Sequence, residues 1–141
     1  MISFLRFWLG LTLLAATTVA GAQGADAVTV QEAQALLAQG GAVLIDVREP
    51  KEHLSGVAPG ARLLPMSQLE SRWREVPSDP ATPVLLICRT QNRSQAVLNQ
   101  LRAKGGYAHL RYVQGGMNEW AMQGGPLVAP ASAVPPASAA R

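Results

Sequence analysis

The sequence is poor in several residues that would widen its possible chemistry. Cys88 is the only cysteine among 141 residues, so no disulfide can form within the chain. The formal net charge is only +3 and the charges are scattered, which argues against a nucleic-acid-binding protein. Of the two histidines, His53 is expected at the surface and His109 at the start of a strand, and neither lies in a general-base motif. A lone thiol of this kind is a reactive group, a partner in an intermolecular disulfide, or an inert buried residue.

The amino-terminal segment has the features of a secretory signal. Residues 1–6 carry a positive charge, residues 7–19 are apolar and uncharged, and Ala20-Gly21-Ala22 fits the small-residue pattern of a signal-peptidase site. The apolar run is shorter than the roughly 20 residues that span a bilayer, which favours cleavage after Ala22 over an uncleaved membrane anchor. The sequence therefore predicts a signal peptide at 1–22 and a periplasmic or secreted protein with no membrane contact after cleavage.

The two ends leave room for one small domain. Residues 128–141 are rich in Pro, Ala and Ser, lack periodicity and are predicted to form a disordered tail. Residues 28–127 then form a single domain of about 100 residues, a common size for one hydrophobic core.

Short apolar runs alternate with helical patterns through this domain. The predicted strands are 28–30, 42–45, 62–65, 84–87 and 109–113, and the predicted helices are 31–39, 51–54, 67–76, 94–104 and 117–123. Ser67 and Glu70 are spaced as a capping box, and Trp73 and Trp120 are expected to pack in helix faces as core. The alternation predicts an α/β fold with a mostly parallel central sheet of about five strands and helices on both faces.

Cys88 lies where the strand 84–87 gives way to a helix, at the strand end where ligands of parallel sheets gather. Flanking cations and helix N-terminal amides favour the thiolate, which is the nucleophilic form of cysteine. Arg89 and Arg93 supply such cations, and four residues separate Cys88 from Arg93. We therefore predict an anion-binding loop that Arg93 completes, with Arg89 placed to attract an anionic substrate.

Three polar residues near this loop have expected supporting roles. Ser94 either caps the following helix or donates a hydrogen bond into the loop. Asp46 and Arg48 come at the end of a neighbouring strand. They are expected to support the loop as an ion pair rather than to take part in the chemistry.

The loop Cys88-Arg89-Thr90-Gln91-Asn92-Arg93-Ser94 resembles the active loop of the rhodanese-like sulfurtransferases. Residues 44–50 with Glu52, residues 56–61 and residues 115–120 resemble three further landmarks of that family, in the same order. The resemblance implies a rhodanese-like domain with Cys88 as the catalytic residue. It also implies a substrate-binding loop formed by Arg89, Thr90, Gln91, Asn92, Arg93 and Ser94.

Two positions depart from the family's pattern. Members commonly have glycine at the position of Gln91, and histidine with isoleucine at the positions of Val57 and Ala58. Glycine tolerates positive φ at little cost, so Gln91 either occupies an ordinary backbone region or alters the fit of the substrate.

The resemblance also implies a reaction. A thiolate at Cys88 would take the outer sulfur of a small anionic donor such as thiosulfate, and cyanide or a thiol would then remove it. This chemistry needs no metal and no organic cofactor. Because the chain has no second cysteine, the acceptor must come from outside, and a redox partner protein is one such source.

Two alternatives stay open at this point. Phosphatases and arsenate reductases of related architecture use a cysteine–arginine loop, but one longer by a residue, so the spacing here favours sulfur. An exported module that carries persulfide sulfur without fast turnover is the other alternative.

Overall fold

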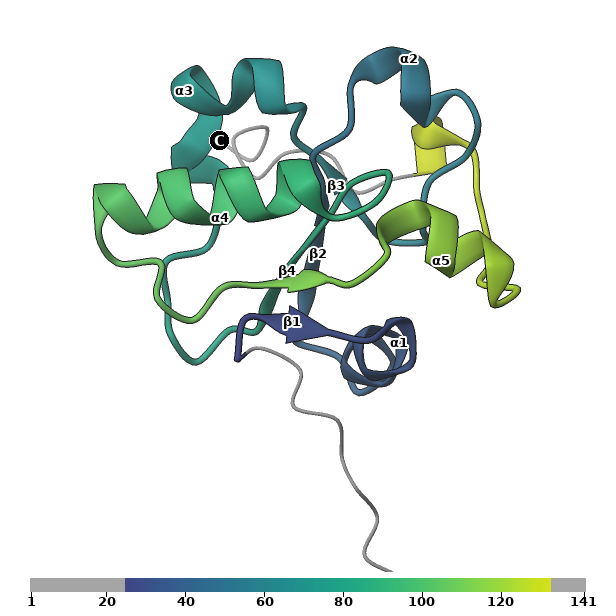
Figure 1. Ribbon diagram of the computed structural model, residues 1–141, viewed down its shortest axis with the longest axis horizontal. Helices are drawn as coiled ribbons and strands as arrows, with labels where there is room; N and C mark the ends of the chain where they lie inside the picture. Colours follow the sequence, from purple (N-terminus) through teal and green to yellow (C-terminus); the bar gives the residue numbers. More distant parts are fainter. Residues whose placement is uncertain (1–24, 133–141) are drawn as a thin grey trace, which may run out of the picture.

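The computed structural model describes residues 25–132, so the predicted signal peptide and residues 133–141 lie outside the described residues. Five short strands form one sheet in which every neighbouring pair is parallel (Figure 1). In spatial order they are β1 (Ala27–Val28), β5 (Arg111–Val113), β4 (Val84–Ile87), β2 (Val43–Asp46) and β3 (Arg62–Leu63). The predicted α/β fold with a parallel sheet is confirmed.

Helices cover both faces of this sheet (Figure 1). They are α1 (Val30–Ala38), α2 (Pro50–His53), α3 (Leu69–Arg72), α4 (Asn92–Lys104) and α5 (Gly116–Met122), with short 3-10 turns at Met66–Gln68, Trp73–Glu75 and Pro130–Ser132. Helices α3 and α4 lie on one face, and α1 and α5 lie on the other. Among residues 25–132 no helix is long and apolar enough to cross a membrane.

The alternation of side chains along β4 divides the core into two layers. Leu85 and Ile87 pack with α1 and α5, in the layer that contains Trp120. Leu86 and Cys88 pack with α4, in the layer to which Trp73 adds a partly buried ring. Cys88 therefore continues the buried pattern of the central strand and faces α4.

The start of the third helical segment differs from the prediction. Ser67 lies inside a 3-10 turn that begins at Met66, directly after Pro65. Its backbone N–H and hydroxyl donate to the Glu49 carboxylate at 3.1 and 2.7 Å, while Glu70 accepts from Lys104. The predicted capping box of Ser67 and Glu70 is therefore wrong, because each side chain has a partner from another element.

The predicted disordered tail begins too early. Val128 forms an antiparallel bridge with Val57, with backbone N–H to O distances of 3.0 and 2.9 Å, and a 3-10 turn follows at Pro130–Ser132. Residues 128–132 are therefore part of the folded domain. Composition did not indicate this bridge, because backbone groups form it and almost any side chain is compatible with it.

Candidate active site

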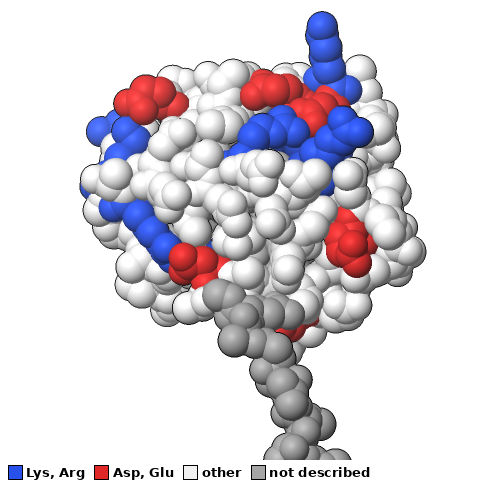
Figure 2. Space-filling model, viewed as in Figure 1, with Lys and Arg blue, Asp and Glu red and all other residues white. Residues whose placement is uncertain are grey.

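Three neighbouring strands bring their carboxyl ends together at one edge of the sheet. Strand β2 leads to Arg48 and α2, β4 leads to the loop from Cys88 to Ser94, and β5 leads to the turn at Gly115 and Gly116. Asp46 pairs in register with Ile87, so Asp46 and Cys88 lie at the ends of adjacent strands. On the face that Figure 2 shows, basic and acidic side chains gather at the end of the molecule where α2 lies.

Cys88 is fully buried, whereas Arg89, Thr90 and Asn92 are exposed on the loop that follows it. Helix α4 begins at Asn92, with Gln91 as its N-cap residue, so Ser94 stands in the first turn and is not the cap. The capping interpretation of Ser94 is wrong because the helix starts two residues earlier than predicted. The Ser94 hydroxyl is buried and has no hydrogen-bond partner among the described residues. It is therefore free to donate to a group bound in the loop.

The backbone of this loop presents a series of unpaired donors. From Arg89 to Ser94, no backbone N–H has an acceptor within residues 25–132. The last of these groups belong to the first turn of α4, where helical geometry leaves N–H groups without partners. Successive unpaired N–H groups at a helix N-terminus form a site for an anion.

Helix α5 orients the loop from the opposite side. The N–H groups of Met117 and Asn118 donate to the carbonyl oxygens of Cys88 and Arg89, at 2.8 and 3.0 Å. Because a trans peptide group is planar, with its N–H opposite its C=O, the N–H groups of Arg89 and Thr90 point away from α5. A Cβ at Gly116 would overlap the carbonyl oxygens of Cys88 and Thr90, so only glycine permits this approach.

Gln91 has φ of −160°, outside the positive-φ region that favours glycine. Its side-chain oxygen accepts the N–H of Gly115 at 3.2 Å. Glycine is therefore not required at this position, and the Gln91 side chain ties the loop to the turn before α5.

Arg93 is held by a carboxylate from another element. Its guanidinium donates two hydrogen bonds to Glu52 of α2, at 2.6 and 2.7 Å. These bonds lower the pKa of Glu52 to about 2, against the opposing effect of burial. The same bonds raise the pKa of Arg93, and the nearby Cys88 contributes to this shift. Sequence reasoning placed Glu52 in a family landmark but did not find its partner, because the two residues are 41 positions apart.

Asp46 and Arg48 form the expected ion pair, with an N–O distance of 2.6 Å. Burial alone would raise the pKa of Asp46, but His53 and Arg48 outweigh it, and the pKa lies below its ordinary value. Arg48 also donates to the carbonyl oxygens of Glu52 and Gly56, at 3.2 and 2.8 Å. It therefore fixes the segment that carries Glu52, and so supports the loop indirectly.

His53 is buried, so its expected surface position is wrong. The single turn of α2 directs its ring toward Asp46, with Nε2 3.6 Å from the carboxylate. The same turn directs the Glu52 carboxylate toward Arg93. The side chains of Glu52 and His53 therefore both point inward. His109 lies two residues before β5, and its Nε2 is 3.2 Å from the carbonyl oxygen of Pro77.

Arg89 and the pocket beside it complete the site. Arg89 is exposed, and its guanidinium has no hydrogen bond or ion pair within the described part of the chain. It lines a pocket of about 520 Å³ between α2 and α5. No cluster of three or more His, Cys, Asp and Glu side chains that could hold a metal occurs in residues 25–132.

Comparison with known families agrees with this arrangement. The family model of the rhodanese-like domain matches residues 29–123. This chain belongs to the rhodanese-like domain family. The match includes the Cys88 loop, the segment with Arg48 and Glu52, and the turn at Gly115 and Gly116.

Individual relatives include proteins named as sulfurtransferases. The chain is 36% identical over 88 residues to a sulfurtransferase of Allochromatium vinosum, covering 62% of this chain and 79% of that protein. The human single-domain sulfurtransferase TSTD1 is 30% identical with a TM-score of 0.59, and the match covers 71% of this chain and 98% of that one. A thiosulfate sulfurtransferase of Pseudomonas aeruginosa is 29% identical with a TM-score of 0.65 over 73% of this chain, but only 20% of that longer chain.

Proposed function

We propose that this rhodanese-like protein is an exported sulfurtransferase that carries a sulfane sulfur as a persulfide on Cys88. The observation that carries the proposal is the run of unpaired backbone N–H groups from Arg89 to Ser94, which begins directly after the thiol. Such donors stabilise an anion, and both a thiolate and a persulfide are anions. The names of its relatives support sulfur as the transferred atom.

The proposed reaction has two steps. The Cys88 thiolate attacks the outer sulfur of a donor such as thiosulfate, so a new S–S bond forms on Cys88. The S–S bond of thiosulfate breaks, and sulfite leaves with its electron pair. Cyanide or an acceptor thiolate then attacks the outer sulfur of the persulfide and releases the Cys88 thiolate, which produces thiocyanate or a new persulfide. These steps use no metal or organic cofactor.

The loop residues divide the work between binding and positioning. Arg89 attracts the anionic donor, and the buried Ser94 hydroxyl, which has no described partner, donates to the bound sulfur. Thr90, Gln91 and Asn92 contribute their backbone N–H groups. Arg93 acts through its charge and through the pair with Glu52 that anchors the start of α4.

A persulfide carrier without fast turnover is the second candidate, and the complete burial of Cys88 favours it. A shielded sulfur reacts slowly with small thiols and so stores its cargo for longer. In either case the acceptor is external, a small thiol or a redox partner protein, because no second cysteine is present. Export through the signal at residues 1–22 would place this exchange in the periplasm or outside the cell.

A turnover assay tests the proposed function. The processed protein is incubated with thiosulfate and cyanide, and thiocyanate is measured alongside a Cys88→Ser variant whose fold is checked by circular dichroism. The proposal predicts thiocyanate from the wild type and none from the variant. A single sulfur bound per molecule without turnover would favour the carrier. Hydrolysis of an aryl phosphate without thiocyanate release would instead favour a phosphatase.

Export has its own test. The amino terminus of the protein isolated from intact cells is sequenced, and a chain that starts at Gln23 is expected. A retained Met1 would contradict cleavage.

A further inference from the structure

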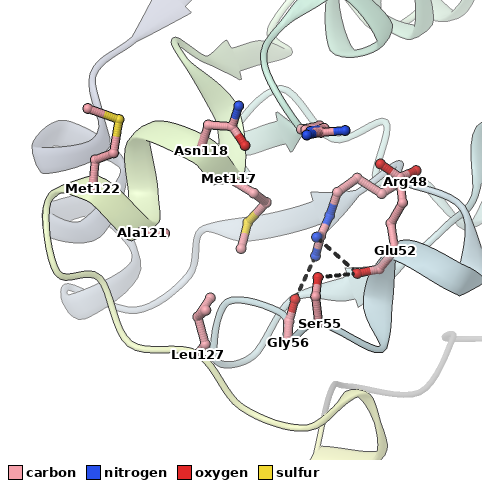
Figure 3. Close-up of a pocket in the computed structure, with 10 residues that line it drawn as sticks. Arg48, Glu52, Ser55, Gly56, Met117, Asn118, Ala121, Met122 and Leu127 are labelled. Carbon is pink, nitrogen blue, oxygen red and sulfur yellow. Dashed lines mark hydrogen bonds between the residues drawn. The ribbon is translucent and has the colours of Figure 1, made fainter.

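The side chain of Cys88 lies in the layer of the core that packs on α4, where Val47 is buried beside it. The pocket between α2 and α5 lies on the other side of the sheet edge. Figure 3 shows this pocket, which is lined by residues that include Gly56, Met117 and Leu127. Because the rest of the α4 layer is hydrophobic core, a reagent approaches Cys88 at the carboxyl edge of the sheet, on the α4 side.

The carboxylate of Glu49 lies on this same side. The N–H of Val47 donates to the carbonyl oxygen of Ile87 at 2.9 Å, which places Val47 beside Cys88. Glu49 comes two residues later with an extended φ of −78° and ψ of 156°, and alternate residues of an extended chain point to the same side. Its carboxylate accepts the N–H and the hydroxyl of Ser67, at 3.1 and 2.7 Å, in the turn that leads to α3. Helices α3 and α4 cover the same face, so Glu49 and the thiol lie on one side of the sheet.

Arg93 and Glu52 are the other charged groups at this approach. The Arg93 guanidinium, in the first turn of α4, is held by the Glu52 carboxylate at 2.6 and 2.7 Å. In Figure 3 that carboxylate and the Glu52 carbonyl oxygen lie at opposite ends of the residue, and only the carbonyl oxygen meets Arg48. Glu52 raises the pKa of Arg93 most, and the charges of Cys88 and Glu49 add to this rise, so these groups form one cluster. We call Glu49, Glu52 and Arg93 the rim of the active loop.

The rim has one negative charge in excess, because it contains two carboxylates and one guanidinium. Arg93 and Glu52 balance each other as an ion pair. Glu49 forms no ion pair with a residue in 25–132, and its hydrogen-bond partner Ser67 is neutral. Arg89 lines the pocket between α2 and α5, so it does not balance Glu49 at short range.

This excess charge acts on the part of a sulfur donor that stays outside the loop. In the proposed reaction the backbone N–H groups of the loop receive the outer sulfur, so the remainder of the donor lies against the rim. The remainder of thiosulfate is a sulfonyl group that bears further negative charge, whereas the remainder of an organic persulfide or thiosulfonate can be uncharged. Over a separation of several ångströms, one additional like charge is expected to slow the reaction about three- to tenfold.

We infer that Glu49 is a specificity-determining residue that selects against negative charge at Cys88, and that the donor is an organic sulfane-sulfur anion with an uncharged remainder. The Cys88 thiolate attacks the outer sulfur of this donor, and an S–S bond forms on Cys88. The bond from that sulfur to the remainder breaks, and a thiolate or sulfinate leaves with the electron pair, so no oxidant or reductant is consumed. Thiosulfate reacts by the same route but more slowly. The donor class rests on the proposed function, whereas charge selection by Glu49 does not.

Alkylation of Cys88 measures the charge of the rim without sulfur transfer. Iodoacetamide and iodoacetate share a leaving group and are similar in size, but only iodoacetate is an anion. The ratio of their rate constants, iodoacetamide over iodoacetate, is expected to be higher for Cys88 than for mercaptoethanol. In Glu49→Gln this ratio is expected to fall about three- to tenfold. The reactivity and the accessibility of the thiolate affect both reagents and cancel in the ratio, so a merely structural effect of the substitution leaves it unchanged.

Matched variants assign the effect to the charge of Glu49. Glu49→Asp keeps the charge and is expected to keep the wild-type ratio. Glu70→Gln removes a carboxylate that pairs with Lys104 at the other end of α4, and it is also expected to keep the ratio. A ratio that Glu49→Gln leaves unchanged, or that Glu70→Gln lowers equally, would overturn the assignment.

Two sulfur donors test the donor class. Methanethiosulfonate differs from thiosulfate by a methyl group in place of one charged oxygen, and mass spectrometry follows the gain of one sulfur on Cys88 from each. Methanethiosulfonate is expected to react faster with the wild type, and its advantage is expected to fall about three- to tenfold in Glu49→Gln. Uptake from both donors with an advantage that Glu49→Gln leaves unchanged, or faster uptake from thiosulfate, would overturn this donor class alone. No uptake from either donor, with alkylation that still depends on Glu49, would refute the sulfurtransferase and support charge selection by Glu49.

Discussion

At the scale of single residues, the main finding concerns Arg93. Its place in the loop predicts a direct contact with the bound anion, but its guanidinium is already held in two hydrogen bonds by Glu52. Cys88 and the loop could be found from sequence because a strand end, a thiol and two arginines are adjacent in the chain. The partner of Arg93 could not, because the contact depends on how α2 packs.

The Glu52 pair predicts a defined pH dependence of stability. The folded pKa of about 2 lies below the ordinary value of 4.5, so ionised Glu52 stabilises the fold fully above pH 4.5, and this stabilisation is lost as the pH falls toward 2. Glu52→Gln should lower the free energy of unfolding by about 1–2 kcal/mol at neutral pH, since the pair is partly exposed. The difference from the wild type should shrink below pH 4.5.

Urea denaturation between pH 2 and 7 measures this difference. Glu75→Gln is the matched control, because Glu75 forms a similar pair with Arg72 away from the loop. Both variants should lose stability, but only Glu52→Gln should slow sulfur transfer. Equal transfer rates in the two variants would contradict a role for Glu52 in positioning the loop.

At the scale of elements, α5 acts as a platform for the Cys88 loop. Its first N–H groups hold the loop carbonyls, and Gln91 connects the loop to Gly115. The helix itself was predictable from the apolar spacing after two glycines. The role of α5 was not predictable, because backbone hydrogen bonds between a helix and a loop leave no pattern in side chains.

Gly116 is the residue on which this platform depends most. Gly116→Ala places a Cβ against the carbonyl oxygens of Cys88 and Thr90, at a φ of +58°. We expect at least about 2 kcal/mol of destabilisation and at least a tenfold loss of sulfur transfer. Gly40→Ala, at a φ of +79° with no atom near the new Cβ, should cost only about 1 kcal/mol and leave transfer intact. Similar transfer rates in both variants would refute the platform.

Gln91 allows a milder test of the same platform. Gln91→Met keeps the length of the side chain but removes the acceptor of the Gly115 N–H. The expected cost is about 1 kcal/mol, with a severalfold slower transfer. Gln31→Met, on an exposed glutamine whose side chain has no hydrogen bond to a described residue, serves as the control and should change neither stability nor rate. An unchanged rate in Gln91→Met would show that this hydrogen bond does not position the loop.

At the scale of the whole molecule, the site forms because the strands of the sheet are parallel and their carboxyl ends lie at the same edge. Strands β2, β4 and β5 are neighbours, so segments far apart in the chain meet at one edge. Apolar runs in the sequence predict β2 and β4, since these strands are buried on both faces, whereas alternation predicts β5. The bridge from Val128 to Val57 could not be predicted in this way, because a proline- and alanine-rich composition gives no signal for it.

This bridge predicts different effects of two truncations. Removal of residues 127–141 deletes both backbone hydrogen bonds to Val57 and the pocket residue Leu127. The Val57 amide should then exchange its hydrogen at least tenfold faster, as measured by NMR, and the free energy of unfolding should fall by about 1–2 kcal/mol. Removal of residues 133–141 alone should change neither quantity, and an equal loss in both truncations would contradict the assignment of the bridge.

Intact-protein mass spectrometry shows whether Cys88 becomes a persulfide. The processed protein is treated with thiosulfate and freed of excess donor, and its mass is measured before and after the addition of cyanide. The Cys88→Ser variant is treated in parallel. We expect a gain of the mass of one sulfur atom on Cys88, its loss on addition of cyanide, and no gain in the variant. A wild-type mass that thiosulfate leaves unchanged, or an equal gain in Cys88→Ser, would contradict it.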